Sequence, residues 1–266
     1  MYLSIILIVI TTLISWQGIK KEYLTDKYSF NIHRVLVNKE YVRFISSGFF
    51  HVNWLHLIIN MVVLFMIGNG LEMNIGSFPF LLIYFTSLVG GNLLALMIHK
   101  HRPLYTSVGA SGAISGLVFA TIALIPGMRI WFLPGWLFGV AYVIYTIYAI
   151  RSQRTDVGHA AHLGGGLIGM LAAVMMFPSV LQTNVLPILL ILLPGVALVL
   201  IMIYRPDLML IDKKTQKRYL NYEDRYNMSK ADQKKEVDRI LEKINQKGID
   251  SLSARERQLL EKYSKS

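Results

Sequence analysis

Seven stretches of mostly apolar residues constrain this chain more than any other feature of its sequence. A helix needs about 20 apolar residues to cross the hydrocarbon core of a bilayer, and each stretch comes close to that length. The predicted spans are 2–17, 54–71, 78–98, 109–126, 131–150, 160–178 and 185–204. The fourth and sixth are rich in Gly, Ala and Ser, which is typical of helices packed inside a bundle. We therefore expect an all-α polytopic membrane protein.

The charged residues separate a membrane part from a polar tail. Only 16% of the residues are charged, against about 25% in a soluble domain, and 16 of the 27 Lys and Arg lie from Arg205 onward. Two capping patterns, at Ser229 to Asp232 and at Ser253 to Glu256, predict two short helices there. The predicted parts are a core of six transmembrane helices at 1–180, a seventh transmembrane helix at 181–204 and a soluble charged tail at 205–266.

Composition also narrows the partners and cofactors. The net charge of +11 does not indicate nucleic-acid binding, because the tail is mixed in sign and the other cations lie in loops between spans, where the head groups of the lipid bilayer fit them. The sequence contains no cysteine, which excludes disulfides, thiolate catalysis and cysteine-bound metals. We expect no cofactor and no metal, and the sequence does not indicate a partner for the tail.

Polar side chains inside apolar spans are costly, so each one is a candidate functional residue. Ser111 heads the fourth span between Gly109 and Gly112, and His162 lies near the start of the sixth. Serine is a weak nucleophile that needs an adjacent base, and histidine is suited to take its proton near neutral pH. We therefore predict a nucleophile–base pair of Ser111 and His162. Because no Asp is placed to orient the histidine, a dyad is expected rather than a triad.

Small residues on both spans would allow this pair to meet. Gly112 begins a stripe of small residues at every fourth position, and Gly165 and Gly169 belong to a similar stripe after His162; such stripes let helices approach closely. The N–H groups and positive dipole end at the head of the fourth span would stabilise an oxyanion. His56 and Asn60, four residues apart on one helical face, would add side-chain donors.

Three other interpretations fit parts of this pattern. A zinc site needs three converging protein ligands, and the sequence has no His-Glu-x-x-His pair. A small transporter with a proton relay would usually need an intramembrane carboxylate, and spans four to six contain none. Ser and His side chains can also simply hydrogen-bond helices together, which is the interpretation we favour for Asn92 and Ser115.

Together, these residues resemble the rhomboid family of intramembrane serine proteases. The family pattern has a Gly-x-Ser-Gly motif in the fourth helix, a histidine before a small-x-x-x-small stripe in the sixth, and His-x-x-x-Asn in the second. The matching residues are Gly109-Ala110-Ser111-Gly112, His162 with Gly165 and Gly169, and His56 to Asn60. The resemblance extends to Arg43, Phe50-His51, Gly68 and Glu72, and it covers about residues 1–178. All three motifs, in order and on the correct spans, are a specific signal.

The resemblance implies a serine endopeptidase that cleaves single-pass transmembrane proteins near the membrane boundary. Ser111 would be the nucleophile and His162 the general base and then the general acid. The Ser111 N–H, Asn60 and His56 would form the oxyanion hole, the fifth span a mobile lateral gate, and the long first loop a wedge in the membrane interface. We expect such a protein in a bacterial plasma or inner membrane. The alternative is a non-catalytic rhomboid-like protein that binds transmembrane helices.

Two positions depart from the family pattern, and the sidedness of the protein stays open. Ser115 stands where rhomboids often place an aromatic residue, and Val42-Arg43 stands where they often have Trp-Arg. Ten of the 11 basic residues in the membrane part lie in the loops after spans one, three and five. The positive-inside rule therefore places the active-site mouth in the cytoplasm, whereas the family resemblance implies the outside.

Overall fold

The structure, a computed structural model, describes most of the membrane part and a small part of the tail. Described residues are 2–100, 102–125, 127–130, 132–151 and 158–205, and in the tail 237, 239–246, 248, 251–253, 256–257 and 260. The chain divides into two compact units, Met1–Thr215 and Gln216–Ser266. Each unit is described by itself.

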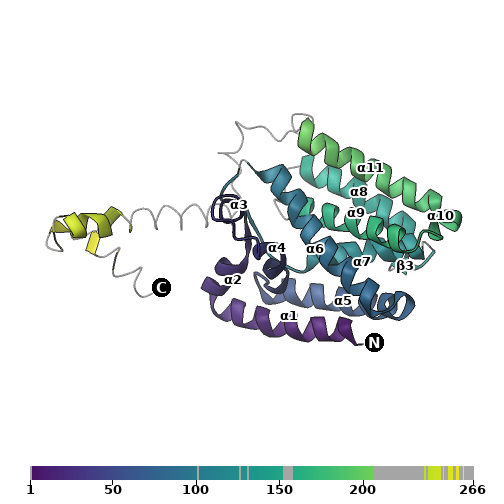
Figure 1. The fold of residues 1–266 in the computed structure, drawn as a ribbon, viewed down its shortest axis with the longest axis horizontal. Coiled ribbons are helices and arrows are strands. Elements are labelled where there is room, and N and C mark those ends of the chain that lie inside the picture. The colour runs from purple at the N-terminus through teal and green to yellow at the C-terminus, as the bar shows by residue number, and fades with distance from the viewer. Residues whose placement is uncertain are drawn as a thin grey trace. The chain divides into compact units, whose positions relative to one another are not determined.

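Seven helices make up most of the first unit, which is an all-α polytopic membrane protein. They are α1 (Leu3–Lys20), α5 (Trp54–Ile75), α6 (Ser77–His99), α7 (Ser111–Leu124), α8 (Gly135–Arg151), α9 (His159–Met176) and α11 (Val185–Tyr204). Figure 1 shows α6, α7 and α9 between the pair α1 and α5 and the pair α8 and α11. The short helix α10 (Val180–Thr183) leads into α11.

Five of the seven predicted spans meet the length and hydropathy of a membrane-crossing helix, and two are shorter. α1, α5, α6, α9 and α11 are long enough, whereas α7 has only 14 residues and α8 is another short apolar helix. α7 begins two residues later than predicted, because Gly109 has a φ of +130° that a helix does not allow. The start of α8 was predicted too early: β3 (Arg129–Ile130) and β4 (Leu133–Pro134) pair as a hairpin before it. Trp131, the predicted first residue of that span, lies outside the described residues.

The long loop between α1 and α5 is structured, as expected. It contains α2 (Glu22–Tyr28), β1 (Phe30–Asn31), α3 (Ile32–Leu36), α4 (Arg43–Ser46) and the 3₁₀ helix η1 (Ser47–Phe49). β1 pairs antiparallel with β2 (Thr106–Ser107), just before α7. The guanidinium of Arg43, 1% exposed, donates to the carbonyls of Asp26 and Ser29 and pairs with Glu40. A buried arginine with several partners holds the loop in one conformation.

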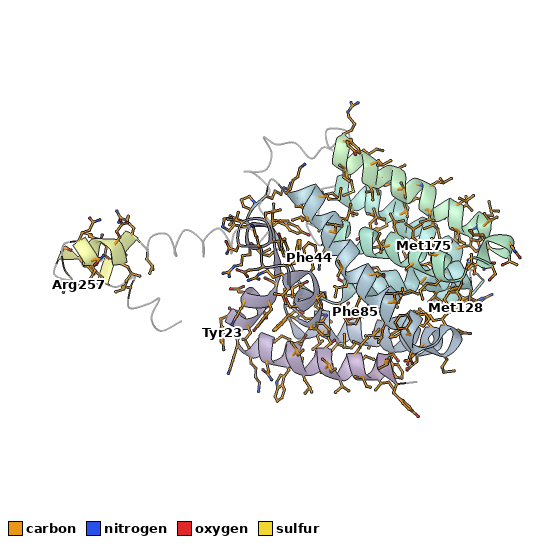
Figure 2. The ribbon with its side chains drawn as sticks, in the orientation of Figure 1. Tyr23, Phe44, Phe85, Met128, Met175 and Arg257 are labelled. Atoms are coloured by element: carbon orange, nitrogen blue, oxygen red, sulfur yellow. The ribbon has the colours of Figure 1, made fainter. Side chains whose placement is uncertain are left out.

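This loop is also anchored to α6. The Asn92 side chain donates to the Phe44 carbonyl at 2.9 Å and to the Ser47 hydroxyl at 3.0 Å. The ring of Phe44, labelled in Figure 2, packs edge-to-face on Phe30. A buried amide in a membrane helix is thereby satisfied by its partners, as predicted for Asn92, and it fastens the loop to the bundle.

Most of the described tail residues are helical. Residues 239–246 are helical, and Val237 and Ile240 are buried. At Ser253, the backbone N–H donates to the Glu256 carboxylate, and the Glu256 N–H donates to the Ser253 hydroxyl. These reciprocal bonds are the capping box that the sequence pattern predicts. The other predicted box, Ser229 to Asp232, lies outside the described residues.

Candidate active site

Ser111 and His162 lie side by side at one end of the bundle. His162 Nε2 is 2.6 Å from Ser111 Oγ, which is within hydrogen-bonding distance for a nucleophile and its base. Ser111 is the first residue of α7, and His162 lies in the first turn of α9. Both residues are half-buried, so the pair is partly accessible.

Glycines bring the two helices together at this point. A side-chain carbon at Gly165 of α9 would collide with the backbone of Gly112, and one at Gly169 would collide with the backbone of Gly116. The two small stripes therefore face each other, and α7 and α9 pack backbone to backbone. α6 joins the contact at Gly91, where an added side-chain carbon would meet the Ala161 carbonyl. His162 is the residue after Ala161, so this packing sets its position.

The turn before Ser111 is also held closely. Gly109, with its positive φ, donates its N–H to the Ser47 carbonyl at 2.9 Å. An added side-chain carbon at Gly109 would lie 2.7 Å from Cε1 and 3.0 Å from Nε2 of His56. Gly109 is thus required both by its backbone conformation and by the His56 ring packed against it.

His56 and Asn60 lie on α5, which packs against α7. The Asn53 side chain caps α5 by accepting the His56 N–H at 2.8 Å. The Asn60 amide donates to the His56 carbonyl at 2.8 Å, and Asn60 is 6% exposed. His56 Nδ1 is buried and has no hydrogen-bond partner within the described part of the chain. The His56 ring touches the turn before Ser111, whereas the Asn60 side chain, among the described residues, is hydrogen-bonded to its own helix.

α8 contributes aromatic contacts around the pair. The Tyr142 ring packs edge-to-face on Phe119 of α7, and its hydroxyl is hydrogen-bonded with Ser115. The Tyr145 ring packs edge-to-face on His159, one helical turn before His162. The bond between Ser115 and Tyr142 agrees with the prediction that Ser115 links helices. In place of an aromatic residue at position 115, the chain has this polar link to α8.

The described residues contain no group of three or more His, Asp or Glu side chains that could hold a metal ion. The polar centre is instead a serine with three histidines, His51, His56 and His162. His51 lies in the loop before α5, and burial, followed by the nearby His56, lowers its pKa to about 3. The arrangement can therefore supply a hydroxyl, a neutral base and hydrogen-bond donors, which is the chemistry of acyl transfer.

Two residues near the site were given no role by sequence reasoning. Ser15 and the His51 ring are both wholly buried and bonded to each other, with Ser15 Oγ 2.8 Å from His51 Nδ1. A signal for Ser15 exists in the sequence: Ser4, Thr11 and Ser15 recur at helical spacing on the buried face of α1. His51 carries no such periodic signal, because it lies in a loop.

The site is embedded in a segment that matches a known family. Residues 38–179 match the Rhomboid domain family, and residues 220–266 match a family of unknown function, DUF6576. The first match includes Ser111, His162, His56 and Asn60. It covers more than half of the 266 residues.

Several curated proteins are similar over the same region. "Rhomboid protein 1, mitochondrial" of Saccharomyces cerevisiae is 31% identical over 169 residues, which cover 59% of this chain and 47% of the relative. "Rhomboid-like protein 11, chloroplastic" of Arabidopsis thaliana is 32% identical over 181 residues, 61% of this chain and 59% of the relative. "Rhomboid protease AarA" of Providencia stuartii is 29% identical over 169 residues, 54% of this chain and 59% of the relative. The alignments span about half the length of these relatives, and together with the domain match they show that the chain belongs to the rhomboid family.

Proposed function

We propose that this protein is an intramembrane serine endopeptidase that cleaves single-pass transmembrane proteins near the membrane boundary with a Ser111–His162 dyad. The observation that carries the proposal is the 2.6 Å distance between His162 Nε2 and Ser111 Oγ. The name of AarA as a protease supports the same activity. Since the alignment covers 59% of AarA, the activity, substrates and partners of this chain are proposals.

Each step of the reaction has a residue to perform it. His162 Nε2 takes the Ser111 hydroxyl proton while Oγ attacks the carbonyl carbon of the scissile peptide bond. The Ser111 N–H at the head of α7, with His56 and Asn60, stabilises the oxyanion. When the tetrahedral intermediate collapses, the leaving amine takes the proton from His162 and an ester remains on Ser111. Water, deprotonated by His162, then hydrolyses the ester and restores the hydroxyl.

The length of α7 supports a cleavage site near the membrane boundary. A helix of 14 residues is about 21 Å long at 1.5 Å per residue, which is shorter than the hydrocarbon core of about 30 Å. If the C-terminal end of α7 reaches one membrane interface, Ser111 at its N-terminal end lies inside the hydrocarbon core, some distance from the other interface. A substrate helix that unwinds at its end can bring a peptide bond to that depth, whereas an intact helix has its backbone groups bonded internally.

The membrane in which this happens is part of the proposal. We propose a bacterial plasma or inner membrane, and one of the similar proteins comes from the bacterium Providencia stuartii. The names of the yeast and Arabidopsis relatives point to mitochondria and chloroplasts and do not support it. A multi-pass location in a membrane follows from the helices themselves.

The direct test is cleavage of a reporter whose transmembrane segment contains helix-destabilising residues, in proteoliposomes. We expect the wild type to cleave it, and Ser111→Ala and His162→Ala to lose cleavage while unfolding at the wild-type temperature. Ser115→Ala is the matched control, one turn further along α7, and it should retain activity. Cleavage by Ser111→Ala would refute the mechanism. Reporter binding without cleavage by the wild type would favour the non-catalytic alternative.

A further inference from the structure

His51 is a wholly buried polar residue beside the dyad that the proposed reaction does not use. It is 0% exposed, and both ring nitrogens have hydrogen-bond partners. Nδ1 lies 2.8 Å from Ser15 Oγ on α1, and Nε2 accepts the backbone N–H of Ala110 at 3.3 Å. The ring thus joins the first transmembrane helix to the residue immediately before Ser111.

The partners determine which nitrogen of His51 carries the proton. A backbone N–H can only donate, so Nε2 must be the unprotonated acceptor. The neutral ring, favoured by burial, then has its proton on Nδ1 and donates it to Ser15 Oγ. The Ser15 hydroxyl in turn donates to the Phe49 carbonyl at 2.8 Å. The three hydrogen bonds therefore form one series in which each group donates to the next, from Ala110 through His51 and Ser15 to Phe49.

The same ring supports the neighbouring parts of the site. His51 packs edge-to-face on His56, with ring centroids 4.9 Å apart, and His56 lies against Gly109. The Gly109–Ala110 turn therefore has three supports: the Ser47 carbonyl, His51 Nε2 and the His56 ring. This turn sets the direction of the Ser111 N–H and hydroxyl, because Ser111 follows Ala110 directly.

We propose that His51 is a positioning residue: as the Nδ1-protonated tautomer held by Ser15, it fixes the Gly109–Ala110 turn and so aims Ser111 at the substrate carbonyl. The proposal rests on the proposed protease function. Through Ser15, it makes α1 part of the structure that positions the nucleophile. A small displacement of a reacting group can lower a rate by about 10²-fold.

Two substitutions of His51 separate its two bonds. The amide of His51→Gln reaches the place of Nε2 and can accept from Ala110, whereas that of His51→Asn reaches only the place of Nδ1. We expect His51→Asn to lower kcat about 10²-fold and His51→Gln to lower it about tenfold or less, with KM changed by less than about threefold in both. A purely structural role would give equal losses for the two amides or losses that follow the unfolding temperature.

A second pair of variants tests the bond at α1. Ser15→Ala removes the acceptor of Nδ1–H and should lower kcat. The matched control is Thr11→Val, one turn earlier, because Thr11 Oγ1 is equally buried and has no hydrogen-bond partner among the residues described. Thr11→Val should leave kcat at the wild-type value. Equal kcat for Ser15→Ala and the wild type would overturn the proposal.

¹⁵N NMR of protein labelled with ¹⁵N-histidine identifies the tautomer of His51 independently of any activity assay. We expect the His51 signal, assigned by its loss in His51→Gln, to show protonated Nδ1 and bare Nε2, and to change in Ser15→Ala. A proton on Nε2 in the wild type would overturn the proposal even if cleavage proceeds as expected. If the wild type does not cleave the reporter although His51 has its proton on Nδ1, the proposed protease function is wrong, and the positioning role that rests on it is wrong as well. If His51→Asn does not fold, Ser15→Ala and the NMR measurement decide.

Discussion

Gly165 on α9 lies against the backbone of Gly112 on α7 so closely that a side-chain carbon has no room between the two helices. Ser111 precedes Gly112, and His162 lies three residues before Gly165 in α9. The approach of the two backbones and the 2.6 Å distance between His162 Nε2 and Ser111 Oγ are therefore parts of one arrangement.

Replacing Gly165 should separate the dyad. Gly165→Ala forces the helices apart or distorts them, and overpacking of this kind typically costs about 1–3 kcal/mol. We expect a lower unfolding temperature in detergent and a loss of reporter cleavage. Gly70→Ala on α5 is the control, because an added carbon there meets no atom within 4 Å. Wild-type activity in Gly165→Ala would show that the dyad does not depend on this contact.

Asn60→Ala should slow turnover rather than abolish it. Removal of one oxyanion donor typically lowers kcat about 10²–10³-fold, and we expect this range with little change in KM. The substitution also removes the bond from the Asn60 amide to the His56 carbonyl. Asn74→Ala controls for that loss, because the Asn74 amide makes the same kind of bond to the Gly70 carbonyl on the same helix. An equal effect of the two variants would argue against an oxyanion role.

Glu72 should be important for stability rather than chemistry. Its carboxylate, 1% exposed, accepts from the N–H groups of Leu3 and Ser4 and from the hydroxyls of Ser4 and Ser77. Glu72→Ala leaves the N–H groups of Leu3 and Ser4 at the start of α1 without this acceptor, at a cost of about 1–3 kcal/mol for each buried donor left unpaired. The Ser4 hydroxyl keeps an acceptor, because Asn69 Oδ1 lies 2.7 Å away. We expect a clear fall in the unfolding temperature in detergent. Ser77→Ala, which removes one of the four bonds, should cause a much smaller fall, and equal effects would contradict this account.

Cysteine labelling decides the sidedness, since the chain has no native cysteine. Lys27→Cys in α2 and Gln182→Cys in α10 are both exposed and lie in loops on opposite sides of the bundle. We expect a membrane-impermeant maleimide to label Lys27→Cys from outside intact cells and Gln182→Cys only after lysis. Ser152, which follows the fifth predicted span, lies outside the described residues.

The motif residues could be predicted from the sequence because each lies in a local pattern with a physical meaning. Ser111 follows a glycine at the head of an apolar helix, and Gly165 and Gly169 follow His162 at helical spacing. The distance between Ser111 and His162 agrees with the pairing inferred from those patterns. The roles assigned to Asn60 and His56 stay predictions, because the described bond of Asn60 is to its own helix.

Other features could not be obtained from local patterns. Hydropathy indicates only the length of an apolar stretch, so the predicted fourth and fifth spans begin before α7 and α8 do. A glycine of positive φ precedes α7, and a short β-hairpin precedes α8. The four hydrogen bonds that Glu72 accepts could not be predicted from the sequence around it, because three of the donors belong to a helix about 70 residues away in sequence.

The sequence alone determined the class of the protein, since apolar length requires membrane helices and small residues at every fourth position require close packing of two of them. Only the tertiary structure decided how the nucleophile is held. A glycine in the sequence indicates that another group approaches its backbone closely, but the sequence does not indicate that this group is the backbone of another helix. The tautomer of His51 likewise depends on Ser15 and Ala110, which are far apart in the chain and meet only when α1, α5 and α7 pack together.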